Sequence, residues 1–86
     1  MTRPKIDEKL ILLTEFGKTE AICAEVLDDP ATPGGVLLKV MARTPFAEDD
    51  QCWIVDDDGS KIGATVKNVF KRTLDSEVTL SVVFPD

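Results

Sequence analysis

The feature that most constrains the fold is a regular alternation of apolar and polar residues near the C-terminal end. Four apolar side chains recur at every second position of the segment SEVTLSVVF (76–84): Val78, Leu80, Val82 and Phe84. Positions 77, 79 and 81 between them are polar. Successive side chains of a strand point to opposite faces, so this alternation is typical of a strand with one buried side. It predicts a strand that ends at Pro85, which has no N–H to donate.

Two further segments predict strands that would pack beside it. SKIGATVKNVF (60–70) also alternates, and its buried face would carry Ile62, Ala64, Val66 and Phe70. The segment 36–41 is apolar on both faces and follows the breaker-rich DDPATPGG, which favours a strand that is central in the sheet or covered on both sides. With a short strand after Gln51, the C-terminal half is expected to form a three-stranded meander from Gln51 to Phe84.

Residues 4–16 allow two interpretations. Thr2, Pro4 and Asp7 would suit the start of a helix, because they are a capping residue, a first-turn residue and a favourable charge. Alternatively, LILLTEF and TEAICAEVL flank the two-residue sequence GK, as the strands of a hairpin do. This hairpin register would set Glu15 opposite Glu20, an unfavourable pair of like charges. Strand-forming residues after position 19 favour strands for both segments.

These segments together predict a single small globular domain over residues 1–86. Its fold class would be mainly β, with five to six antiparallel strands closed as a small barrel or folded as a two-layer sheet. Barrel closure would remove exposed strand edges. The alternative is an α+β domain with an N-terminal helix. A core this small supplies roughly 5 kcal/mol of stability or less, and homodimerisation through an apolar face would be one way to add to it.

Missing residue types exclude several kinds of activity. The chain has no histidine, which removes Ser-His-Asp and Cys-His catalytic sets and His-ligated zinc. Its two cysteines, Cys23 and Cys52, cannot form a four-thiolate zinc site, and their apolar neighbours predict buried free thiols. Neither GxGxxG nor a Walker loop is present. We therefore expect no enzymatic activity, no cofactor and no metal.

The N-terminal segment predicts a cytoplasmic location and no membrane partner. Its apolar run covers only Leu10 to Leu13. A signal peptide needs about 7–15 apolar residues and a membrane helix about 20.

The excess negative charge is concentrated in one segment. Between Arg43 and Lys61 there is no basic residue, and the segment contains six acids: Glu48, Asp49, Asp50, Asp56, Asp57 and Asp58. The other ten acids balance the ten bases, which leaves the net charge of −6 in this segment. The distribution predicts a local acidic patch on the surface.

The sequence DDDG does not fit a calcium loop. Counted from Asp56 as the first position of an EF-hand loop, the required glycine is Lys61 and the required glutamate is Lys67. If the segment between the two acidic clusters is extended, Asp50 and Asp57 lie roughly 23 Å apart, at opposite ends of one strand. A shared cation site is therefore not expected.

A β-hairpin explains DDDG better. With Asp58-Gly59 as a two-residue turn, the facing pairs would be Asp57–Ser60, Asp56–Lys61, Val55–Ile62 and Trp53–Ala64. In this register Trp53 is expected in the core, and Asp56 would form an ion pair with Lys61 on the outer face.

The function favoured by these observations is a non-catalytic cytoplasmic protein-binding or adaptor module. It would present the acidic patch to a protein with a basic surface through five residues: Glu48, Asp49, Asp50, Asp57 and Asp58. The alternative is a small nucleic-acid-binding β-barrel that uses Lys67, Lys71 and Arg72. The net negative charge and the lack of an exposed stacking aromatic on that face make nucleic acid the less favoured partner. An acidic nucleic-acid mimic and a cation-binding module are less favoured still.

Overall fold

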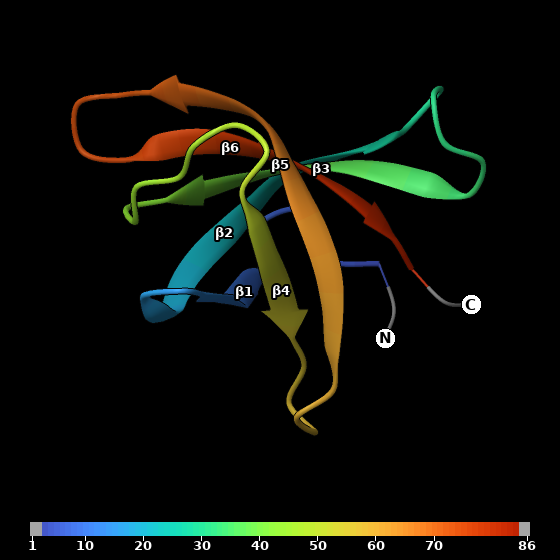
Figure 1. The fold of residues 1–86 in the computed structure, drawn as a ribbon, viewed down its shortest axis with the longest axis horizontal. Helices are drawn as coiled ribbons and strands as arrows, with labels where there is room; N and C mark the ends of the chain where they lie inside the picture. Colours follow the sequence, from blue (N-terminus) through green and yellow to red (C-terminus); the bar gives the residue numbers. More distant parts are fainter. Residues whose placement is uncertain (1–2, 85–86) are drawn as a thin grey trace.

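Six antiparallel strands close into a small barrel in the computed structural model, which describes residues 3–84 (Figure 1). The strands are β1 (Lys9–Thr14), β2 (Gly17–Asp28), β3 (Gly35–Ala42), β4 (Gln51–Val55), β5 (Lys61–Lys71) and β6 (Ser76–Val83). The predicted antiparallel barrel is confirmed. The α+β alternative is wrong, because residues 4–16 form an irregular segment followed by β1 and its turn. Nothing within residues 3–84 is a helix that could cross a membrane.

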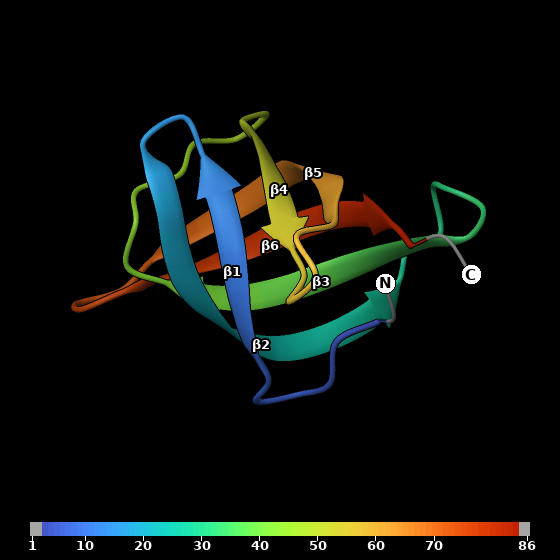
Figure 2. The ribbon, with the colours of Figure 1, turned by 90° about the horizontal axis from the view of Figure 1, so that it is seen from below.

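The barrel consists of two three-stranded meanders, β1-β2-β3 and β4-β5-β6, which meet along two lines. Strand β3 pairs with β6 over eight residue pairs. Strand β1 pairs with β4 over only three, whereas all other neighbouring strands share five to eight. In Figure 2, β1 and β4 lie side by side where the barrel closes. We call this short β1–β4 pairing the seam.

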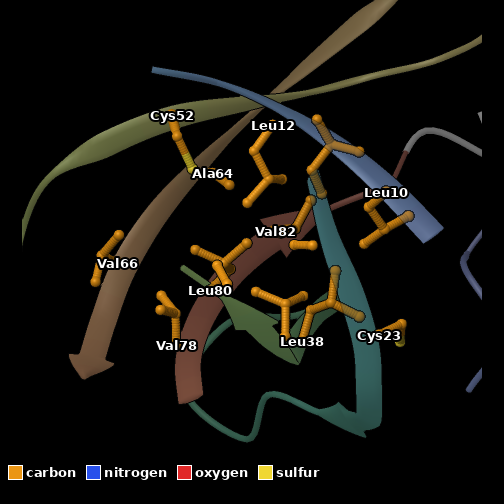
Figure 3. Close-up of a cluster of buried hydrophobic side chains, with 14 of the residues drawn as sticks. Leu10, Leu12, Cys23, Leu38, Cys52, Ala64, Val66, Val78, Leu80 and Val82 are labelled. Carbon is orange, nitrogen blue, oxygen red and sulfur yellow. The ribbon is translucent and has the colours of Figure 1, made fainter. Parts of the chain in front are cut away.

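Inward-pointing side chains fill the barrel (Figure 3). The four apolar residues of the segment 76–84 are all buried, which confirms the alternation predicted for β6. At the centre, Leu80 pairs with Leu38 on β3 and with Val66 on β5, and all three side chains are fully buried. Cys23 and Cys52 are buried free thiols, as predicted.

The β1–β2 hairpin turns two residues earlier than predicted. Thr14 pairs with Gly17, so Glu15 and Phe16 form the turn, where GK was expected. The Thr14 hydroxyl accepts a hydrogen bond from the Phe16 N–H at 3.1 Å, and Gly17 provides the left-handed φ of 110° that closes the turn. Because Glu20 faces Ile11, the unfavourable Glu15–Glu20 pair does not form.

The β4–β5 hairpin is shifted by one residue from the predicted register. The Asp56 N–H donates to the Ser60 carbonyl at 2.7 Å, so the loop has three residues, 57–59, and it ends at Gly59 with φ of 88°. Such a loop places a type I turn before a glycine bulge. The prediction that Asp58-Gly59 is a two-residue turn is therefore wrong.

This shift of one residue exchanges the two faces of β4. Cys52 and Ile54 point into the core, while Trp53 points outward and is only partly buried, so the expectation of a core Trp53 is wrong. Lys61 faces Val55 and does not pair with Asp56. Its Nζ lies 5.6 Å from the centre of the Trp53 ring.

A β-bulge in β5 overturns the predicted burial of Phe70. The pairing with β6 shifts between Val66 and Asn68, which leaves Lys67 as an extra residue and reverses the alternation beyond it. Val69 therefore packs against the core, and Phe70 points outward with 65% of its surface exposed. The bulge also explains Asn68, which lies on the exposed side of the strand.

Alanine substitution is expected to affect stability differently at two glycines in strands, Gly35 and Gly63. A Cβ on Gly35 would lie 2.9 Å from the Thr32 Cβ and 3.0 Å from the Thr32 carbonyl oxygen, within a hydrogen-bonded turn. We expect Gly35→Ala to lower the free energy of unfolding by about 1–3 kcal/mol through overpacking. A Cβ on Gly63 would meet only the Trp53 Nε1, at an ordinary 3.9 Å. Gly63→Ala should therefore change stability by about 0.5 kcal/mol or less, or increase it slightly. Urea denaturation of both variants measures the difference, and equal losses would contradict the assignment.

Candidate binding sites on the barrel

Strand β4 separates the two acidic clusters. Residues 48–50 precede the strand and residues 56–58 follow it, at its opposite end, which confirms the predicted separation. In the described part of the chain, no three Asp, Glu or Cys side chains lie close enough together to hold a metal ion. The five predicted partner-binding residues therefore do not form one patch, and each cluster has to be considered by itself.

In the first cluster, Asp50 holds the loop and its two neighbours point to solvent. The Asp50 carboxylate accepts a hydrogen bond from the Ala47 N–H at 2.9 Å. The Asp49 N–H donates to the Val66 carbonyl at 2.8 Å, and Asp49 has a φ of 70°, so the backbone here is fixed against β5. The side chains of Glu48 and Asp49 are exposed and make no ion pair or hydrogen bond to other described residues.

In the second cluster, two of the three aspartates stabilise their own turn. The Asp58 carboxylate accepts a hydrogen bond from the Ser60 N–H at 2.8 Å, and this bond lowers the pKa of Asp58. The Asp56 carboxylate accepts one from the Asp57 N–H at 2.9 Å. Only the Asp57 carboxylate makes no hydrogen bond or ion pair among the described residues.

An apolar depression adjoins the first cluster, where β1 and β4 diverge beyond the seam. Its volume is about 370 Å³, and we call it the aromatic hollow. It is lined by Thr14, Glu15, Phe16, Pro45, Phe46, Asp50, Gln51 and Trp53. Phe16, at the tip of the β1–β2 turn, has 78% of its surface exposed. The sequence prediction missed this hollow because it placed Trp53 in the core and did not assign Phe16 to a turn.

The predicted basic strip is only partly brought together. Lys67 lies at the β5 bulge, and Lys71 and Arg72 lie at the start of the β5–β6 turn. The Arg72 Nε is 3.4 Å from an Asp75 carboxylate oxygen. The expectation that this face lacks an exposed aromatic is wrong, because the bulge turns Phe70 outward.

A second depression of about 210 Å³ lies between the end of β3 and the β5–β6 turn, and we call it the hairpin hollow. It is lined by Arg43, Pro45, Phe46, Lys71, Arg72, Thr73, Leu74, Asp75 and Ser76. Arg43 comes from a segment 28 positions before Lys71, and sequence reasoning assigned it no role. Lys67 does not line this hollow.

The two thiols are poor nucleophiles near neutral pH. Burial, and secondarily the nearby Asp50 carboxylate, raises the pKa of Cys52 to about 11. Burial and the Glu8 carboxylate also raise the pKa of Cys23. Since the thiolate is the reactive form, neither residue is suited to covalent catalysis at pH 7.

Comparisons with protein-family models, with curated proteins and with solved structures gave no match to this chain. Its function is therefore inferred from the residues on its own surface.

Proposed function

We propose that the chain is a non-catalytic protein-binding or adaptor module. Its partner would have a basic surface and would bind the face formed by the β1–β2 turn and the loop 43–50. The observation that carries this proposal is the aromatic hollow, which has the exposed Phe16 on its border and the free carboxylates of Glu48 and Asp49 in the adjoining loop.

The composition of this face supports protein binding. Interfaces combine a few aromatic anchors that become buried with a polar rim that excludes water. Phe16 and Trp53 would be such anchors, and Glu48 and Asp49 would belong to the rim. The Lys61 Nζ lies 5.6 Å from the centre of the Trp53 ring, and this contact supports a role for the indole in binding a basic side chain.

The predicted residues differ in the role that we propose for them. Glu48 and Asp49 would contact the partner directly. Asp50 and Asp58 would act mainly by holding their loops, because their carboxylates accept hydrogen bonds from nearby backbone N–H groups. Asp57, at the far end of β4, would contribute long-range attraction to a basic partner.

The proposal includes a cytoplasmic location. Two buried cysteines that form no disulfide support it, because free thiols persist in reducing compartments.

The test uses a tagged protein to recover partners from a lysate of the native host. The variants are Phe16→Ala and the double variant Glu48→Lys with Asp49→Asn. Asparagine at position 49 removes the charge and tolerates the left-handed φ. Each variant should lower the recovery of specific partners about tenfold, and 0.5 M salt should do the same to the parent protein.

A matched double variant provides the control. Asp7 has a φ of 72°, close to that of Asp49, and Glu20 is an exposed glutamate on β2. Asp7→Asn with Glu20→Lys therefore changes the net charge by the same amount at residues that do not line the aromatic hollow. The control should recover the parental set of partners. If it loses the same partners as the test variants, general acidity is responsible and the proposed face is wrong.

A further inference from the structure

The hairpin hollow concentrates positive charge in a chain whose net charge is negative. Three of the ten basic residues line it: Arg43, which directly follows β3, Lys71, the last residue of β5, and Arg72 in the β5–β6 turn. The single carboxylate among the lining residues belongs to Asp75. The local charge is therefore about +2, opposite in sign to the loop that follows Arg43.

Asp75 orients Arg72 and leaves several N–H donors of the Arg72 guanidinium available. The ion pair joins the Arg72 Nε to an Asp75 carboxylate oxygen at 3.4 Å, and the Arg72 N–H donates to the Asp75 carbonyl at 2.9 Å. A guanidinium has five N–H donors in a fixed plane, so the two terminal nitrogens remain for another acceptor. The turn thus presents a pre-positioned arginine beside Lys71 and opposite Arg43.

We infer that the hairpin hollow binds a phosphate monoester. Such a group carries a charge of about −1.5 to −2 near pH 7, which matches the local charge of about +2, and it has three acceptor oxygens. One arginine guanidinium can donate two parallel hydrogen bonds to these oxygens, and a lysine ammonium group adds a point charge. The hydroxyls of Thr73 and Ser76, which also line the hollow, are further donors of suitable chemistry.

The apolar border suits the carbon part of the ligand. Leu74 has 79% of its surface exposed, and Pro45 and Phe46 form the opposite wall. A phosphorylated side chain or a small phosphorylated molecule would place its carbon atoms there. The hairpin hollow shares Pro45 and Phe46 with the aromatic hollow. The inference nevertheless rests on charged residues that are different from Glu48 and Asp49 and of opposite sign.

The experiment follows the backbone amide signals of the isotope-labelled protein by NMR. The probes are inorganic phosphate, O-phosphoserine, a phosphoserine peptide and a single-stranded oligonucleotide. Phosphate and phosphoserine should shift the amides of residues 43 and 71–76 in a saturable way. Arg43→Gln and Lys71→Gln should each weaken this binding about tenfold. Lys18→Gln, on β2 and outside the hollow, should leave it unchanged.

Comparing the four probes distinguishes the possible sources of the phosphate group. A peptide that binds more tightly than phosphoserine would identify a phosphorylated protein, and equal affinities would identify a small molecule; both support the inference. The amide spectrum of each variant also shows whether the barrel is intact. Absent saturation, or shifts spread over all basic positions, would overturn the inference. An oligonucleotide that alone saturates these amides and that of Phe70 would also overturn it, in favour of the nucleic-acid alternative.

Discussion

Replacing Leu80 by alanine is expected to remove about two fifths or more of the stability of the protein. The side chain has 0% of its surface exposed, and it pairs with Leu38 and Val66 on the two neighbouring strands. Deleting a buried leucine side chain costs about 2–5 kcal/mol, because apolar contacts are lost and a cavity remains. A domain of this size has roughly 5 kcal/mol in total. The midpoint of urea denaturation, followed by circular dichroism, measures the loss.

Leu74→Ala is the matched control for this prediction. The same atoms are removed from a leucine that is 79% exposed in the β5–β6 turn. The expected change is within about 0.5 kcal/mol. Similar losses in the two variants would show that Leu80 is not the centre of the core.

The second large effect is a loss of stability at alkaline pH. The pKa of Cys52 is about 11 in the folded barrel, against 9.0 for a free thiol. The raised pKa means that the neutral thiol is favoured by folding, so its contribution is complete below pH 9. It is lost as the pH rises to 11, because the unfolded chain releases the proton first. Two pKa units correspond to about 2–3 kcal/mol, and Cys23, whose pKa is also raised, acts in the same direction.

Urea denaturation at pH 8, 9, 10 and 11 tests this prediction. Cys52→Ala removes the titrating thiol, so it should be less stable at pH 8 and should lose less with rising pH than the parent protein. Lysines that titrate in the same range are common to both proteins and cancel in the comparison. Parallel curves for the two proteins would contradict the role of Cys52.

Much of the fold could be predicted because it depends on local alternation. The apolar positions of β6 alternate without interruption and the apolar run of β3 is broken only by Lys39, so both strands and the antiparallel meander followed from residue order. Strand β3 has a neighbour on each side, as a central strand would, but only its inward face is fully buried, so the expectation of cover on both faces is wrong. The first hairpin was also predictable as a pair of strands. The position of its turn was not predictable, because a turn at residues 15–16 and a turn at residues 17–18 would both place Gly17 in or next to the turn. Only the hydrogen bond to the Thr14 side chain distinguishes the two turns.

The register of β4 was not predictable for a different reason. Cys52, Trp53, Ile54 and Val55 are all apolar, so either alternating pair could face the core. The choice then depends on whether the DDDG loop has two or three residues, and both options place glycine where a positive φ is needed. The aromatic hollow could not be predicted for the same reason, because it forms only when Trp53 points outward.

Contacts between distant segments set the remaining features. The bulge at Lys67 depends on how β5 fits β6, and without it Phe70 would be buried. Arg43 meets Lys71 only because β3 and β6 are neighbours in the barrel. No local sequence pattern predicts a contact between segments so far apart in the chain.

The short seam has a consequence for the order in which the chain folds. Four of the six strand pairings join consecutive strands, so each meander can form by closing short loops. Only the β3–β6 and β1–β4 pairings need distant segments to meet. The eight residue pairs between β3 and β6 contribute far more stability than the three pairs between β1 and β4. We therefore expect an open six-stranded sheet to form first, with closure at the seam as the last step.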